Sequence, residues 1–293
     1  MSIVDLSELP APDVLEPLDF EEAYAERLSV FRGFMGDNWS APLESDPVVK
    51  LLEVSAYVGI GDRARVNDAA KALLLAHAIG SDLDQLGANV NTPRLVIQAE
   101  DLRAVPPVEK ITEGNDAYRE RIQLAYEGLT TAGPRNSYKL HARNASALVA
   151  DASAESPSPA CVTVTVLGLE GDGAVGPELL AVVARALNDE NVRPLGDRLT
   201  VQSAQVLPYR IDAVLHMKGP GPESAVALAE AERRLAAWIN PRKRLGVEVA
   251  RSAVDAQLHV PGVSRVELIG WQDLAPTQAQ AAFCTGYSVK LGE

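Results

Sequence analysis

The histidines are the first candidates for chemistry in this sequence, because an imidazole can bind a metal ion or transfer a proton near neutral pH. Each of the four falls in a different predicted helix or strand: His77, His141, His216 and His259. None has a second histidine, a cysteine or a carboxylate at metal-ligand spacing on the same element. The spacing therefore predicts structural histidines and no zinc site.

The two cysteines, Cys161 and Cys284, lie far apart and form no CxxC motif. A pair this sparse in a chain of 293 residues is not a disulfide framework, so we expect a reducing, cytoplasmic environment. Cys161 and His216 could act as nucleophile and base only if two strands brought them together. Cys161 lies among alternating Val and Thr residues and Cys284 lies beside Phe283, which is typical of core packing.

A glycine-rich segment, Gly168 to Gly173, precedes a predicted helix, and backbone amides at such a place can bind phosphate. The segment lacks the Gly-Lys-Ser/Thr ending of a P-loop and a true GxGxxG motif, and Glu170 and Asp172 would repel phosphate. It also lacks the spaced carboxylates of a calcium loop. The pattern predicts a plain turn.

Acidic pairs occur at Glu21 and Glu22 and at Asp82 and Asp84. They fall in the first turns of predicted helices, where the helix dipole favours negative charge and the side chains face solvent. We therefore expect no paired-acid hydrolase. The sequence predicts no catalytic, cofactor-binding or metal-binding residue and no cofactor.

Three tryptophans fall outside the predicted cores, where large aromatic side chains are either interface anchors or partly buried packing residues. Both readings remain open for Trp39, Trp238 and Trp271.

The composition is that of a globular protein, with 47% hydrophobic and 23% charged residues. A formal charge of −13 and no basic run longer than Arg242-Lys243-Arg244 make nucleic acid an improbable partner. The acidic, proline-rich start is unlike a signal peptide. The most apolar stretch, Val48 to Ile60, is interrupted by Lys50 and Glu53, so we expect no membrane partner.

The first part of the chain shows helical periods. We expect a helix over 21–34, one that starts at Asp46-Pro47, one over 63–78 that ends at Gly80, and a short one from Ser81 to Leu86. Gly59 and Gly61 separate the second from the third. Alanine-rich faces predict close helix packing, in a bundle or a helix-mediated dimer.

Residues 91–114 form a predicted connector, and helices are expected from Asn115 and from Gly133-Pro134 to about 147. Further on, alternating patterns predict strands over 162–166, 199–206, 211–217, 263–269 and 285–291. Helices are predicted over 176–188, 221–238 and 246–258, the first two after a repeated Gly-Pro-Glu.

This order predicts an α+β fold, with an N-terminal helical region followed by two small α/β modules of the strand-helix-strand, two-layer type. The expected divisions are an arm and first helix (1–45), a helical bundle or dimerisation region (46–90), a connector with helices (91–147), a first α/β module (148–207) and a second (208–293).

Several segments of the chain have a recognisable sequence and order: 46–53, 65–72, 80–87, 119–128, 131–141, 191–195, 245–246 and 258–263. Through these segments most of the chain resembles the baseplate J-like proteins of contractile phage tails and of phage-tail-like particles such as R-type pyocins, also called tailocins. Two departures are the glycine-bearing segment 58–62, where the family has a leucine- and arginine-rich helix, and Tyr126, where proline is common. The first departure predicts a break in the helix near residue 60.

The resemblance implies a structural role in a baseplate wedge and no enzymatic activity. Two copies pair in each wedge, bind a baseplate I-type tail protein, and join other wedges in a six-fold ring around the central hub and spike. It also implies contacts with the sheath and with a small lysozyme-like W-type wedge protein, after assembly in the bacterial cytoplasm. The ring holds the extended sheath and passes on the contraction trigger. Two other functions stay open: a monomeric scaffold or adaptor, and an enzyme that uses the loop Gly168–Gly176.

Overall fold

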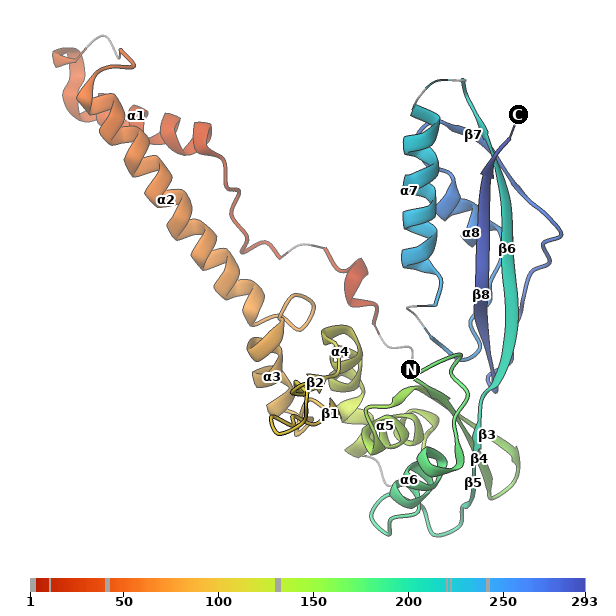
Figure 1. Ribbon diagram of the computed structural model, residues 1–293. Coiled ribbons are helices and arrows are strands. Elements are labelled where there is room, and N and C mark those ends of the chain that lie inside the picture. The colour runs from red at the N-terminus through yellow and green to blue at the C-terminus, as the bar shows by residue number, and fades with distance from the viewer. Residues whose placement is uncertain are drawn as a thin grey trace. The chain divides into compact units, whose positions relative to one another are not determined.

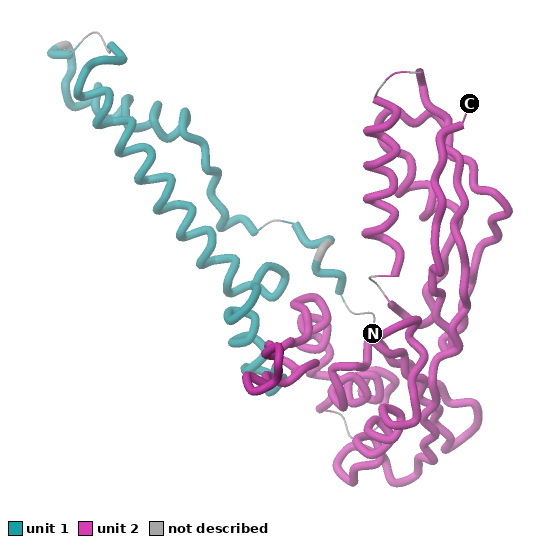
Figure 2. The backbone as a smooth tube through the Cα atoms, in the orientation of Figure 1, with its two compact units in different colours: residues 1–93 teal, residues 94–293 magenta. Residues whose placement is uncertain are grey.

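The fold is α+β, as the sequence predicts. The computed structural model describes residues 4–10, 12–39, 43–129, 133–219, 221, 223–240 and 243–292. The chain divides into two compact units, residues 1–93 and residues 94–293 (Figure 2). The first is helical, and the second carries three sheets (Figure 1).

Unit 1 is built on a helical hairpin of α1 (Phe20–Met35) and α2 (Pro47–Ala72), with α3 (Gly80–Ala88) after it. Short 3-10 turns, η1 (Leu6–Glu8) and η2 (Gly36–Asn38), flank α1. Asp19 caps α1, and Asp46 caps α2 by accepting the amide hydrogen of Val48 at 2.9 Å. The predicted cap at Asp46, with proline in the first turn, is confirmed.

The predicted break near residue 60 is wrong, because α2 runs unbroken through Gly59 and Gly61. A Cβ atom at position 59 would lie 2.0 Å from the Arg27 guanidinium, which also bonds the Ser55 hydroxyl at 3.2 Å. Gly59 therefore gives α1 a close approach to α2 and does not end the helix.

The predicted helix over 63–78 is also wrong at its end. α2 stops at Ala72, and a turn brings Ala78 to a buried position before α3. Gly80, predicted to cap that helix, is the first residue of α3 and has a positive φ of 53°. Apolar residues of the turn continue the helical period, so the pattern does not show where the helix ends.

The core of unit 1 is thin and made mostly of small side chains. α1 and α2 together bury only Ala23, Val49, Ala56 and the polar Asn67. Asn67 holds the chain before α1 by donating to the Glu16 carbonyl at 2.8 Å and accepting its amide hydrogen at 3.0 Å. The hairpin therefore depends on polar contacts more than on buried apolar area.

Unit 2 begins in the predicted connector with a small hairpin of β1 (Val96–Gln98) and β2 (Ile111–Thr112). α4 (Asn115–Leu124), the 3-10 turn η3 (Ala125–Leu129) and α5 (Arg135–Ala145) follow, close to the predicted helices. Tyr126, the second departure from the family pattern, lies in η3. Residues 131 and 132 of the family segment lie outside the described residues.

The first α/β module has a sheet in the order β3-β4-β5. β3 (Val149–Ser158) runs antiparallel to β4 (Cys161–Gly168), and β5 (Arg198–Ser203) is parallel to β4. α5 and α6 (Pro177–Leu187) pack on one face of this sheet. The core there includes Tyr138, Val164, Val166, Val183 and Leu187.

The second module has a sheet in the order β7-β6-β8, formed by β6 (Gln205–Met217), β7 (Val263–Leu268) and β8 (Gln280–Leu291). α7 (Glu223–Trp238) and α8 (Arg251–Leu258) cover one face (Figure 1). The core between them includes Ile211, Leu215, Leu235, Val254 and Leu258, all 0% exposed.

Three predicted boundaries in this module are wrong. The strands expected over 199–206 and 211–217 are β5 and a continuous β6, which passes through Pro208 because β8 pairs along its whole length. The helix expected from Gly246 starts at Arg251, since Val249 pairs with Leu274. The last strand begins at Gln280. Pro222 of the second Gly-Pro-Glu lies outside the described residues.

Candidate interaction surfaces

The candidate metal and nucleophile residues do not assemble. Among the described residues, no three His, Cys, Asp or Glu side chains could hold one metal ion. Cys161 belongs to β4 of the first sheet and His216 to β6 of the second, where its Nε2 lies 3.1 Å from Glu267 Oε2. Cys284 is buried, and burial raises the pKa of its thiol, which disfavours the reactive thiolate.

The other histidines lie apart from one another. His77 is in the turn after α2 and His259 follows α8, both exposed. His141 is half-buried on α5, and that burial lowers the pKa of its imidazole, which favours the neutral form. The prediction that each histidine lies in a helix or strand is confirmed for His141 in α5 and His216 in β6 and is wrong for His77 and His259, which follow the ends of α2 and α8.

The glycine-rich segment forms the turn between β4 and α6. The Gly168 amide donates to the Gly173 carbonyl at 2.8 Å, and the Ala174 amide donates to Asp172 Oδ1 at 3.0 Å. Lys243 Nζ donates to the carbonyls of Leu169 at 2.9 Å and Gly171 at 2.5 Å. Two backbone amides of this turn donate within the turn, and two of its carbonyls accept from the Lys243 ammonium group. The arrangement therefore does not suit an anion.

The acidic pairs lie on helix faces, and the tryptophans take part in packing. Glu21 and Glu22 are exposed in the first turn of α1, and Asp82 and Asp84 are exposed on α3. Trp39 packs edge-on against Phe31, and Trp271 packs edge-on against Tyr209. Trp238 is partly buried and packs against the core of the second α/β module. Packing within the chain therefore explains all three.

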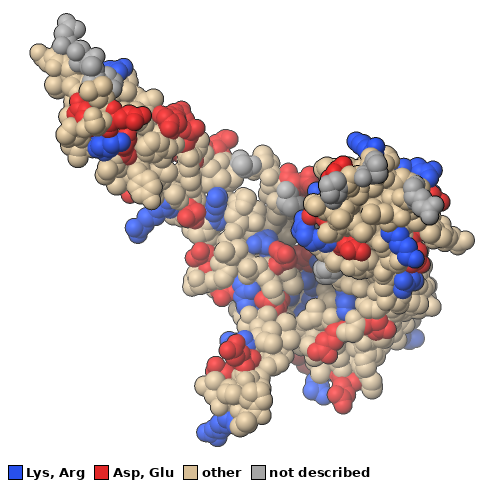
Figure 3. Space-filling view, turned by 45° about the horizontal axis from the view of Figure 1, so that its top comes forward, with Lys and Arg blue, Asp and Glu red and all other residues tan. Residues whose placement is uncertain are grey.

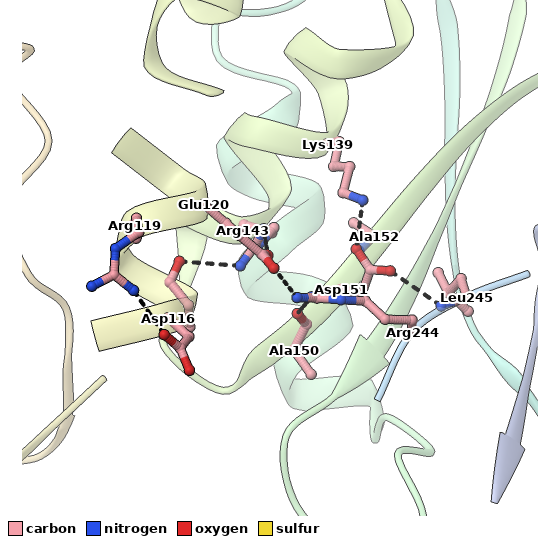
Figure 4. A network of polar contacts seen from close by, with 11 residues as sticks. Asp116, Arg119, Glu120, Lys139, Arg143, Ala150, Asp151, Ala152, Arg244 and Leu245 are labelled. Atoms are coloured by element: carbon pink, nitrogen blue, oxygen red, sulfur yellow. Dashed lines mark hydrogen bonds and ion pairs between the residues drawn. The ribbon is translucent and has the colours of Figure 1, made fainter. Parts of the chain in front are cut away.

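A polar joint connects the two α/β modules inside unit 2 (Figure 4). Glu120 of α4 accepts from Arg143 of α5 at 3.0 Å and pairs with Arg244, which follows α7. The buried Asp151 of β3 pairs with Lys139 at 2.9 Å and accepts the Leu245 amide hydrogen at 3.1 Å. The joint is built from both modules, so each fixes the other.

The joint also contains an apolar cluster, and the chain passes through it from the last strand of the first sheet into the second sheet. Ala204 lies between β5 and β6, where the chain leaves the first sheet and enters the second. Its amide donates to Val166 at 2.9 Å, and the next amide, of Gln205, donates to Ala279 at 3.0 Å. Leu167, Leu245 and Ala281 pack around Ala204. Sequence patterns gave no sign of the joint, because its members lie up to 124 residues apart.

A second feature that the sequence did not single out is an exposed apolar face on α2. Leu51, Val54 and Val58 are 68%, 59% and 55% exposed, and they lie three and four residues apart on one side of the helix. The opposite side packs on α1. We call Leu51, Val54, Val58, Asp62, Arg65 and Ala69 the outer face of α2.

The charged side chains form no basic stripe on the face seen in Figure 3, where Lys and Arg alternate with Asp and Glu. None of the helices in the described residues combines the length and the apolar character needed to cross a membrane.

Comparison with known proteins gives the family. Models of the baseplate J-like N-terminal domain and of the baseplate J-like central domain match residues 44–101 and 130–203. The chain is 48% identical to baseplate protein J of Escherichia phage P2, over 100% of this chain and 99% of that protein. This chain belongs to the baseplate J-like family.

A solved structure, the cryo-EM structure of the anti-feeding prophage baseplate, also contains a similar chain. The similarity has a TM-score of 0.39 and 15% identity, over 62% of this chain and 46% of that one. It is too weak to add to the family assignment, and this chain spans less than half of that chain's length.

Proposed function

We propose that this chain is a structural subunit of the baseplate of a phage tail or phage-tail-like particle. The observation that carries the proposal is the 48% identity to baseplate protein J of Escherichia phage P2 along the whole chain. The architecture suits it, because a rigid two-module unit and a helical unit with an exposed apolar face are devices for docking.

In finer terms, the chain is a wedge subunit with two copies per wedge. It binds an I-type tail protein and, with other wedges, forms the ring around the hub and spike that holds the sheath and passes on the contraction trigger. The W-type wedge protein and the sheath are further neighbours. The particle assembles in the bacterial cytoplasm, and the function is a change of packing and not of covalent bonds.

We assign contacts within a wedge to the helical region 46–90 and contacts between wedges to the modules at 148–207 and 208–293. Support for the first assignment is the exposed outer face of α2. Support for the second is the joint around Asp151 and Arg244, which lets two modules behave as one rigid block between neighbours.

The test is to locate the chain in assembled particles. A tagged chain imaged by electron microscopy is expected in a six-fold feature at the base of the sheath, and removal of its gene is expected to abolish complete tails. A chain found free of particles and bound to a single partner would instead favour the monomeric adaptor. Heat stabilisation of the chain by a nucleotide or metal would favour an enzyme using the Gly168–Gly176 loop.

A further inference from the structure

The backbone joins the two α/β modules of unit 2 at one place. The chain leaves the first sheet at the end of β5, passes through Ala204 and enters β6 of the second sheet. The Ala204 amide donates to the Val166 carbonyl of the first sheet, whereas the Gln205 amide donates to the Ala279 carbonyl beside the second. Each side of Ala204 is therefore fixed to its own module, and a rotation between the modules falls on the φ and ψ angles of this residue.

Three residues that follow α7 form a second link, which is not covalent, and we call Lys243, Arg244 and Leu245 the clasp. The clasp binds polar groups of the first module and of α4 (Figure 4): the Leu169 and Gly171 carbonyls with Lys243 at 2.9 and 2.5 Å, Glu120 and the Ala150 carbonyl with Arg244, and Asp151 with the Leu245 amide at 3.1 Å. The link therefore depends on hydrogen bonds and charge.

Little apolar surface is buried between the modules. Among the described residues, the apolar cluster at the joint has four buried members, Leu167, Ala204, Leu245 and Ala281, and two of these are alanine. The cores of the first and second modules contain nine and fourteen buried residues. Because apolar burial stabilises roughly in proportion to the area removed from water, each module is held together more firmly than it is held to the other.

Packing at the joint is also incomplete. A cavity of about 160 Å³ lies between the modules, lined by side chains of α5 and by residues 152–154 of β3 on one side and by Gln278 on the other. One hydrogen bond crosses beside it, from the Ser153 hydroxyl to the Gln278 carbonyl at 2.6 Å. Close packing is what resists motion inside proteins, and the cavity removes part of that resistance here.

The charged pair of the clasp is accessible to water. The side chains of Arg244 and Glu120 are 30% and 34% exposed. Dissolved salt screens the attraction between partly exposed charges, and water competes for their hydrogen bonds. The pair can therefore separate without leaving a buried charge behind.

We propose that the clasp opens reversibly, so that unit 2 alternates between the closed form described here and an open form. In the open form the modules 148–203 and 205–293 turn about Ala204, and each keeps its own fold. In the closed form they move as one block. The inference goes beyond the proposed function and does not depend on it. A neighbouring protein that binds the open form more tightly shifts the equilibrium toward that form, which gives the chain a place at which packing can change.

The first experiment measures hydrogen exchange of single amides in the full-length, unsubstituted chain. The Leu245 amide is bonded across the joint to Asp151, so it exchanges whenever the clasp opens. The amides of Val214 and Leu215 lie in β6, which is paired on both sides, so their exchange requires the sheet to unfold. We expect the protection of Leu245 to be at least about a hundredfold lower than theirs. Equal protection at the three positions would contradict the proposal.

The second experiment measures the distance between the modules by pulsed electron paramagnetic resonance. Spin labels are attached to Ala181→Cys on α6 and Ala236→Cys on α7, both exposed, in a chain that also carries Cys161→Ser. In this chain we expect one dominant distance. Adding Lys243→Ala and Arg244→Ala should raise the population of a second distance at least about tenfold, because charge-assisted hydrogen bonds across the joint are lost.

The matched control removes two other cations, with Arg233→Ala and Arg234→Ala on α7. Both pair with Glu230 of the same helix, so the control should keep the distance distribution of the intact clasp. Circular dichroism checks that each variant is folded.

Salt gives a readout that needs no change in the clasp. Raising sodium chloride from about 0.05 to 0.5 M should increase the second population of the labelled chain about threefold, because the Arg244–Glu120 attraction is screened. A distance distribution that stays the same at both salt concentrations and in the folded clasp variant would overturn the proposal. Fast exchange of Leu245 with an unchanged distance would overturn it too, because the segment would then fray without any motion of the modules.

Discussion

The two units of this chain reach stability by different routes. Unit 2 contains two apolar cores with fully buried large side chains such as Leu187, Leu215 and Leu258. The hairpin of unit 1 buries mainly alanine, and it exposes apolar residues as large as Phe34, which is 86% exposed. The difference indicates that apolar area buried within unit 2 stabilises that unit, whereas unit 1 leaves apolar area exposed and available to another surface.

The ion pairs of the two units also differ in how far their side chains are buried. Those of unit 1 face solvent, as Lys50 and Glu53 do, with side chains 57% and 33% exposed. Unit 2 buries the Arg121–Glu113 pair, with side chains 3% and 8% exposed. Exposed pairs add little stability, whereas breaking a buried pair leaves an uncompensated charge.

The largest effect is therefore expected from Glu113→Ala. In this variant the buried Arg121 keeps Asn144 as an acceptor at 2.5 Å but loses its ion pair with the Glu113 carboxylate. The free energy of unfolding should therefore fall by about 3–5 kcal/mol. Urea denaturation followed by circular dichroism measures this. Glu53→Ala in unit 1 is the control, with an expected loss of under about 1 kcal/mol. Equal losses in the two variants would remove the contrast between the units.

A smaller effect is expected from Asp151→Asn at the joint. The amide oxygen can still accept from Leu245, but the charge that pairs with Lys139 is lost, so stability should fall by about 1–3 kcal/mol. Limited proteolysis should then cut more readily between the modules. Asp212→Asn, which breaks an exposed pair with Arg210, is the control and should behave as wild type. An intact proteolysis pattern in Asp151→Asn would show that the apolar cluster suffices.

A gain of stability is expected from Gly61→Ala in unit 1. No atom lies within 4 Å of the added Cβ, and alanine favours a helix interior over glycine by about 0.5–1 kcal/mol. Gly59→Ala should gain less, because its Cβ displaces Arg27. Hydrogen exchange of the α2 amides compares the two. The reverse order would mean that Arg27 contributes nothing to the hairpin.

The smallest effect concerns alkaline pH and unit 2. Burial, with Cys284 nearby, raises the pKa of Tyr209 to about 12. In the unfolded chain this phenol ionises near pH 10, so its contribution is complete below pH 10 and is lost as pH rises toward 12. Tyr209→Phe should flatten the fall in urea midpoint over that interval. Tyr57→Phe on α2, whose side chain is 75% exposed, should leave the slope as in wild type.

Local signals in the sequence explain much of the fold. The start of α2 follows from Asp46-Pro47, and α6 follows from Gly176-Pro177, because caps and proline act within one turn. The continuity of α2 near residue 60 and the continuity of β6 could not be predicted, since they involve Arg27 approaching Gly59 and β8 pairing through Pro208. Tertiary contacts override local preference at both places.

The candidate surfaces also divide into features that local sequence signals address and features that depend on tertiary contacts. Scattered histidines and cysteines predicted no metal or nucleophile cluster, and this stays a prediction. The exposed face of α2 was hidden, because Val54 and Val58 carry the same helical period as a buried face. The joint around Asp151 needed the folded chain, since its partners come from four separate segments.

The passage of the chain from β5 through Ala204 into β6 has a mechanical consequence. β6 runs parallel to β8 from the Gln205–Gln280 pair to the Leu215–Leu291 pair, with one shift of register between Tyr209 and Arg210. A load that pulls β6 along its own axis acts on this ladder in shear, so many hydrogen bonds must break together and none can be peeled off first. Because β5 and β6 follow each other with a single residue between them, tension on the first sheet reaches the second through the backbone itself.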